Sequence, residues 1–145
     1  MECWGDDYYG QSSPPTGTFV SVSTGVFHSC GIDISGSVQC WGKDDYGQST
    51  VPGGLSNVVA ISAGVYHNLV LISDGTVTAW GGGDFGQSTI PGDLSDVVAI
   101  SGGHQLSLAL KSDGTVSAWG LDGNGQTNVP SDLRSVVAIS TGAFY

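Results

Sequence analysis

Three cysteines and three histidines are the side chains with the most distinctive chemistry in this chain of 145 residues. Thiolates and imidazoles are zinc ligands, a thiol beside an imidazole can act as a nucleophile, and two thiols can form a disulfide. The six residues are Cys3, Cys30, Cys40, His28, His67 and His104. Which of these roles is possible depends on how the strands of the fold position the six side chains.

Aspartates form a second candidate site, because they gather after Trp-Gly pairs. They are Asp6, Asp7, Asp44, Asp45, Asp84 and Asp122. Several carboxylates in a glycine-rich turn can bind calcium. Their spacing is not that of an EF-hand loop, however, and aspartate commonly caps such turns through hydrogen bonds to the local backbone. We therefore expect no metal site and no cofactor.

Catalytic motifs are absent from the sequence. Cys30 has no histidine and asparagine partners marked by a motif, no serine stands in Gly-x-Ser-x-Gly, and the single glutamate is Glu2. We expect a protein that is not an enzyme.

The charge balance restricts the partners. Three Lys and Arg against 13 Asp and Glu give a formal net charge of −10 and a pI near 4.1. Such a chain repels nucleic-acid phosphates and anionic lipids and favours cationic partners. The longest apolar runs, such as Val58–Ile61, are four residues, and the N-terminus lacks the pattern of a secretory signal. We expect neither nucleic-acid binding nor a membrane segment.

The elements that position these residues belong to an internal repeat. Trp-Gly recurs at intervals of 37, 39 and 39 residues, and Gly-Gln follows each tryptophan by six positions. Residues 58–89 and 97–128 share 18 identities in 32 positions. The repeat-defining residues are Trp4, Trp41, Trp80, Trp119, Gly10, Gly47, Gly86, Gly125, Gln11, Gln48, Gln87 and Gln126. This regularity predicts one structural unit copied along the chain.

Each repeat has the pattern of a small antiparallel sheet. In the second repeat, residues 58–62, 68–72 and 76–80 have strand character, and the loop 73–75 predicts a hairpin that closes with glycine. Counting outward from this loop places Leu69 opposite Ala79. Residues 87–91 are expected to add an outer edge strand. Four short strands per repeat predict an all-β fold made of propeller blades.

The order of motifs within a repeat resembles the repeat of the regulator-of-chromosome-condensation family. The resemblance rests on Gly64–His67, Ser73–Val77, Trp80-Gly81 and Gly86-Gln87 and covers essentially the whole chain. It implies a β-propeller, which in this family usually closes with about seven blades. It also implies that the histidine shared by His28 and His67 is structural.

We expect one repeat domain over residues 1–145, with just under four blades. The blades are expected at about 18–54, 55–93 and 94–132, between partial blades at 1–17 and 133–145. Both ends then leave unpaired strand edges. Either several chains join head to tail into a ring, of which one chain is half, or the chain is a fragment of a longer propeller.

The same register places Cys30 opposite Cys40, at the positions of Leu69 and Ala79. A disulfide fits this pairing and would indicate an oxidising, extracytoplasmic compartment. The alternative is a pair of small buried hydrophobic side chains. Cys3 takes the Cys40 position of a blade whose partner strand is missing, so we expect it to be an unpaired thiol.

Histidines and aromatic residues are assigned structural roles. A ring of histidine ligands would need one in every repeat, but the positions that match His28 and His67 hold Leu106 and Tyr145, and His104 lies at another phase. The four tryptophans end strands and are expected in the core. Tyr9, Tyr46 and Phe85 recur at one repeat position and are expected to pack between neighbouring blades.

Together these patterns favour a non-enzymatic propeller module for protein–protein interaction or self-assembly. One alternative is glycan recognition by tryptophan or tyrosine at the blade tops, which an exposed tryptophan would support. Another is a recently amplified or engineered repeat fragment without an evolved ligand. The family's nucleotide exchange and chromatin binding are not supported, because no loop insertion stands out and the chain is acidic. Photoreception is not supported either, because all four tryptophans are repeat-defining.

Overall fold

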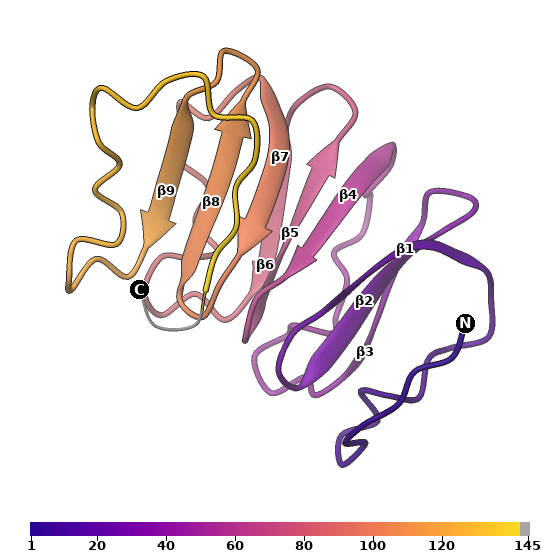
Figure 1. The fold of residues 1–145 in the computed structure, drawn as a ribbon. Helices are drawn as coiled ribbons and strands as arrows, with labels where there is room; N and C mark the ends of the chain where they lie inside the picture. Colours follow the sequence, from indigo (N-terminus) through magenta and orange to yellow (C-terminus); the bar gives the residue numbers. More distant parts are fainter. Residues whose placement is uncertain (143–145) are drawn as a thin grey trace.

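Nine antiparallel β-strands make up the regular structure of residues 1–142, the part of the chain that the computed structural model describes. They are β1 (Phe19–Thr24), β2 (His28–Asp33), β3 (Val38–Gly42), β4 (Val58–Ala63), β5 (His67–Ile72), β6 (Val77–Gly81), β7 (Val97–Gly102), β8 (Leu106–Lys111) and β9 (Val116–Gly120). Each consecutive set of three forms one sheet, and the three sheets stand side by side (Figure 1). The all-β blade architecture is confirmed. The match of Tyr145 to the histidine position lies outside the described residues.

The hairpin inside each blade has the predicted register. Leu69 pairs with Ala79 across β5 and β6, and Cys30 pairs with Cys40 across β2 and β3. Gly75 closes the turn with a φ of 85°, a conformation that glycine adopts without a steric penalty. Asp74 Oδ1 accepts hydrogen bonds from the Thr76 backbone at 3.0 Å and from its hydroxyl at 2.7 Å. Local sequence therefore sets this turn.

The prediction of an outer fourth strand at residues 87–91 is wrong, because each blade has three strands. This segment consists of turns. The Gly86 amide donates to the Gly83 carbonyl and the Thr89 amide to the Gly86 carbonyl, while Pro91 has no amide to donate. The Thr89 and Pro91 positions therefore offer no free amide to β6, and the segment forms no strand beside it.

The expectation of just under four blades is also corrected, to three. Residues 121–142 hold no assigned strand, although 136–141 repeat the pattern of Val97–Gly102. This segment still lies against the third blade, because the Thr141 amide donates to Ser101 Oγ at 3.0 Å and the Val136 amide to the Gly114 carbonyl at 3.1 Å. Residues 1–18 likewise hold no strand (Figure 1). This segment lies against the first blade, because the Gln11 carbonyl accepts hydrogen bonds from Ser29 Oγ at 2.9 Å and Trp41 Nε1 at 3.0 Å.

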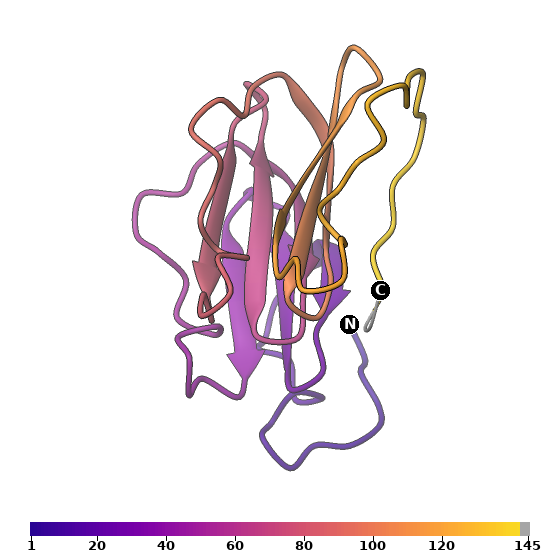
Figure 2. The same cartoon turned by 90° about the vertical axis from the view of Figure 1, so that its left-hand side faces the viewer.

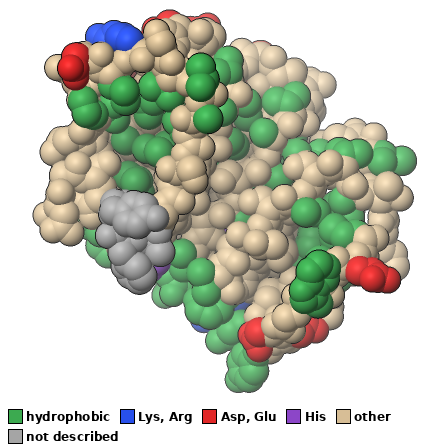
Figure 3. Space-filling model, viewed as in Figure 1, with side chains coloured by type: hydrophobic (Ala, Val, Ile, Leu, Met, Phe, Trp, Pro, Cys, Tyr) green, Lys and Arg blue, Asp and Glu red, His purple; other side chains and the backbone are tan. Residues whose placement is uncertain are grey.

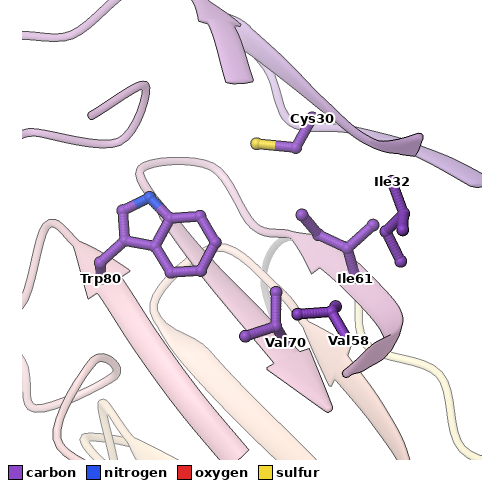
Figure 4. Close-up of a cluster of buried hydrophobic side chains, with 6 residues drawn as sticks. All are labelled: Cys30, Ile32, Val58, Ile61, Val70 and Trp80. Carbon is purple, nitrogen blue, oxygen red and sulfur yellow. The ribbon is translucent and has the colours of Figure 1, made fainter. Parts of the chain in front are cut away.

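The hydrophobic core lies between neighbouring blades, whose sheets stack as layers in the turned view (Figure 2). Successive side chains of a strand point to opposite faces, so β5 serves two interfaces. Val70 packs toward the first blade, and Leu69 and Leu71 pack toward the third. In Figure 4 the Trp80 indole of the second blade and Cys30 of the first border the same cluster, which also contains Ile61. Each blade is thus stabilised mainly by its neighbours.

Backbone contacts between blades explain one recurring glycine. A Cβ atom on Gly64 would lie 2.5 Å from the carbonyl oxygen of Gly103 in the next blade, closer than real Cβ atoms approach. Serine side chains bond the same inner strands together: Ser23 Oγ accepts from the Ala63 amide and Ser62 Oγ from the Gly102 amide, both at 2.9 Å. Glycine therefore permits the close approach that these hydrogen bonds need.

A disulfide joins Cys30 and Cys40 within the first blade, where their Cα atoms lie 4.1 Å apart. Cys3 is a free, half-buried thiol. No helix in the described part of the chain is long and apolar enough to cross a membrane.

Candidate binding surface: the aromatic face

Three of the four repeat tryptophans belong to the core. Trp41, Trp80 and Trp119 are buried, and each Nε1 donates to the backbone carbonyl of a glutamine one repeat earlier, at 3.0–3.2 Å. Trp4 contradicts the expectation of a core position, because it is 88% exposed. Trp80 and Trp119 also pack against core clusters that include the preceding blade, whereas Trp41 of the first blade contacts Phe19 of its own sheet. What the three share is the Gly-Gln turn one repeat earlier, and within the described residues no such turn precedes Trp4.

The Gly-Gln motif builds the turn that receives these tryptophans. Gly10, Gly47, Gly86 and Gly125 have φ values of 74–82°. Each following glutamine accepts, through its side-chain Oε1, a hydrogen bond from the backbone amide two residues earlier at 2.8–3.0 Å, at Gln11, Gln48, Gln87 and Gln126. The glutamine side chain thereby holds the turn, and the carbonyls of the first three accept from the tryptophans.

The two equivalent histidines connect neighbouring blades. His28 Nε2 donates to Asn68 Oδ1 at 2.8 Å, and His67 Nε2 lies 2.9 Å from Ser107 Oγ. Ser107 in turn donates to the Gln87 carbonyl at 2.9 Å. Burial lowers the pKa of His28, and burial together with the nearby His28 lowers the pKa of His67 to about 4. Both imidazoles are therefore neutral hydrogen-bond donors at pH 7.

Three of the aspartates after Trp-Gly cap turns. Asp44 accepts from the backbone amides of Ser49 at 2.6 Å and Thr50 at 3.0 Å, and Asp7 and Asp122 make the equivalent bond to the amide five residues ahead. The hydrogen bond from Ser13 Oγ, together with that from the Ser12 amide, lowers the pKa of Asp7, and the bond from the Thr127 amide lowers the pKa of Asp122. Within residues 1–142 no three His, Cys, Asp or Glu side chains are grouped as metal ligands.

Aromatic side chains gather on one face of the blades: four of them form a connected row of rings, and Phe85 lines a hollow together with Tyr46 and Tyr66. We call this surface the aromatic face and define it as Tyr9, Phe27, Tyr46, Tyr66 and Phe85. Ring centroids are 5.7 Å apart for Tyr9 and Phe27, 6.0 Å for Phe27 and Tyr66, and 5.1 Å for Tyr46 and Tyr66. The loops that carry these residues precede the middle strand or follow the third strand of a blade, so they meet at the same end of the sheets.

The face is accessible as well as connected. Tyr46 is 50% exposed and Phe85 is 44% exposed. Tyr9 and Tyr46 do contact rings of the adjoining loop, as expected of residues that pack between blades, but their outer surfaces are open. Partly exposed aromatic side chains are enriched in the contact surfaces of proteins.

Charge complements this apolar row. Lys43 Nζ lies 4.8 Å from the centroid of the Tyr9 ring and 5.3 Å from that of Phe27, and 3.0 Å from Asp45 Oδ2. The hydrogen bond to Asp45 raises the pKa of Lys43. A hollow of about 110 Å³ lies one repeat further on, between Tyr46, Tyr66 and Asp84. Elsewhere, acidic groups outnumber the sparse basic ones on the side shown in Figure 3.

Sequence reasoning found the repeat positions of three of these residues but did not join them to Phe27 and Tyr66. The signal was present, because Phe27 and Tyr66 occupy the same position before their histidines. Their proximity to Tyr9 and Tyr46 depends on how one blade stacks on the next, which the repeat spacing does not show.

Blades of three strands, stacked through tryptophans that pack on the preceding turn, define this chain as a β-propeller repeat protein. The family described as Regulator of chromosome condensation (RCC1) repeat matches residues 19–48, 58–87 and 97–126, more than half of the chain. The chain therefore belongs to this repeat family. Comparison with curated proteins found no match.

Solved propeller structures share the fold. Prp20p of Saccharomyces cerevisiae, whose structure was reported with its binding to Gsp1p and histones, is 24% identical with a TM-score of 0.67, over 82% of this chain and 35% of that one. The same yeast protein in its complex with Kap60 is 23% identical with a TM-score of 0.68, over 90% of this chain and 41% of that one. The ectodomain of the receptor kinase CR4 from Physcomitrella patens is 22% identical with a TM-score of 0.68, over 90% of this chain and 38% of that one. The chain thus spans between about a third and two fifths of these proteins.

Proposed function

We propose that the chain is a non-enzymatic module that binds a protein partner through the aromatic face. The observation that carries the proposal is the aromatic face, in which four rings form a connected row and Tyr9, Tyr46 and Phe85 are exposed. Rigid aromatic side chains contribute large contact area at little cost in conformational entropy. Repeat folds commonly bind proteins through such extended surfaces.

Two further observations support a protein partner. Propellers of similar fold bind proteins, namely Gsp1p, histones and Kap60 in the case of the yeast protein. The net charge of −10 favours a partner with a basic surface.

Site-specific photocrosslinking tests this function. Tyr8 is 81% exposed beside the aromatic face, and Ile34 is 74% exposed on the β2–β3 hairpin at the other end of the sheet. We expect a benzoylphenylalanine at position 8 to crosslink a protein in extract of the native cells, and the same group at position 34 to give no such adduct. A Tyr66→Ala change in the position-8 chain should abolish the adduct. Adducts from both positions, or persistence in the Tyr66→Ala chain, would contradict the assignment.

We propose self-association as a second activity of the chain. The segment 136–141 carries first-strand sequence but pairs with no strand within residues 1–142, and the Trp4 indole is exposed. Unpaired strand edges and exposed aromatic side chains are templates for association with a second copy.

Light scattering coupled to size exclusion measures this directly. We expect a mass above 14.7 kDa that persists in reductant, because the contact is made by strand edges and not by Cys3. A mass that stays at 14.7 kDa across the concentration range would overturn self-association. A mass that falls to this value in reductant would assign the contact to the thiol instead.

A further inference from the structure

The hollow on the aromatic face has a counterpart one repeat earlier that is already filled. Its lining includes Tyr46, Tyr66, Gly82 and Asp84. In the preceding repeat the equivalent positions are Tyr9, Phe27, Lys43 and Asp45. The two sites therefore share two aromatic rings and a carboxylate, and differ in the exchange of lysine for glycine.

Lys43 shows what such a site holds. Its ammonium group lies against the Tyr9 ring at 4.8 Å and the Phe27 ring at 5.3 Å, with the Asp45 carboxylate at 3.0 Å. Aromatic rings attract a cation through their negative faces, and the carboxylate neutralises its charge. The first site is thus a cage for an ammonium group, occupied by the chain's own lysine.

The second site keeps the cage without the lysine. The Tyr46 and Tyr66 rings are 5.1 Å apart, and glycine at position 82 leaves the space between them and Asp84 open at about 110 Å³. A Cβ atom on Gly82 would lie 3.1 Å from Tyr66 Cβ, so a longer side chain here would start directly beside the rings. Within residues 1–142, Asp84 makes no ion pair and its carboxylate accepts no hydrogen bond, unlike Asp45.

The third repeat does not form a similar cage. Gln105 takes the Tyr66 position, Leu121 takes the Gly82 position and Gly123 takes the Asp84 position, so one ring and the carboxylate are lost and glycine is replaced by an apolar residue. Among these repeats, the open cage is therefore found at one boundary, between Tyr46 and Tyr66.

We propose that the pocket between Tyr46, Tyr66 and Asp84 binds the side chain of a lysine from a basic protein partner, in the place that Lys43 takes one repeat earlier. The proposal rests on the proposed function, because it names the chemistry by which a partner engages the aromatic face. Charge complementarity supports it, since the chain carries a net charge of −10 and the pocket holds an unpaired carboxylate.

A capped glycine peptide with one central lysine is the probe, and amide NMR spectra of the whole chain are the readout. We expect saturable shifts at residues 82–87 and at Tyr66, and no shifts when the lysine is Nε-acetylated. Asp84→Asn should weaken binding about tenfold, because the carboxylate and the rings act on the same charge. Equal shifts with the acetylated peptide, or no shifts at all, would overturn the lysine pocket.

Two exchanges between the repeats give matched variants. Gly82→Lys should fill the second cage from within and abolish peptide binding, while Lys43→Gly should empty the first cage and create a second set of shifts around Tyr9 and Phe27. The gain of a site cannot result from misfolding, so Lys43→Gly keeps the test decisive if Gly82→Lys unfolds. Peptide binding that persists in folded Gly82→Lys, or a folded Lys43→Gly that shows no second set of shifts, contradicts the proposal. Crosslinking from position 8 would persist in that case, so the protein-binding function would stand without the lysine pocket.

Discussion

Trp80→Ala is expected to lower the free energy of unfolding by about 4 kcal/mol, whereas Trp4→Ala should change it by less than about 0.5 kcal/mol. Trp80 is 7% exposed and packs across the boundary between the first and second blades, against a cluster that includes Cys30 and Val70. Its removal opens a cavity and leaves the Gln48 carbonyl without the hydrogen bond that Nε1 donates at 3.2 Å. Trp4 occupies the same repeat position but is 88% exposed.

Urea unfolding followed by far-ultraviolet circular dichroism measures both variants without relying on tryptophan fluorescence. The pair is a controlled comparison, because residue type and repeat position are the same and the preceding blade differs. Equal losses would show that the tryptophan stabilises its own turn. The stacking of blades would then not be its role.

The free energy of unfolding should fall as the pH is lowered from about 6.5 to about 4, and His67 alone should account for about 3 kcal/mol of the loss. Burial holds the pKa of His67 at about 4 in the folded state, while the unfolded chain binds a proton near pH 6.5. Between these values the unfolded state carries more protons, so acidification favours unfolding. The stabilisation is present in full above pH 6.5. Burial lowers the pKa of His28 as well, which adds a loss in the same direction.

His67→Leu should flatten this part of the profile. Leu106 occupies the equivalent position of the third repeat and is buried there, so leucine is a substitution that the fold already contains. Urea midpoints at several pH values between 4 and 7.5 give the slope for each chain. A wild-type profile that is flat in this range, or a variant with the wild-type slope, would contradict the assignment.

At lower pH a separate group of carboxylates determines how stability changes with pH. Hydrogen bonds lower the pKa of Asp33, Asp74 and Asp113 in the hairpin turns, and of Asp7 and Asp122 in the turns after Trp-Gly. A carboxyl group whose pKa is lower in the folded state stabilises the fold at pH values above its pKa in the unfolded chain. This stabilisation is lost as the pH falls toward the pKa in the folded state. The carboxylate contribution therefore disappears below about pH 4, after that of the histidines.

Sequence patterns predicted features whose cause lies within a few residues. The Ser-Asp-Gly loop fixes its own hairpin, because Asp74 bonds the Thr76 backbone and Gly75 accepts a positive φ; the pairings of Leu69 with Ala79 and of Cys30 with Cys40 then follow by counting. The expected outer strand is absent: the turn at Gly86 takes the Thr89 amide, and Pro91 has no amide to donate. Identical spacing cannot reveal that competition.

By itself, the sequence determined the repeat, the hairpin register, the all-β class and the acidic charge, since each depends on composition or on neighbours along the chain. The tertiary structure alone decided which repeat tryptophan is buried, because burial accompanies a hydrogen bond to the Gly-Gln turn one repeat earlier, which Trp41, Trp80 and Trp119 make. It also brought Phe27 and Tyr66 to Tyr9 and Tyr46, and separated a cage filled by Lys43 from one left open by Gly82. These contacts form when one blade stacks on the next, so their distances depend on packing between repeats and not on the order of residues within one.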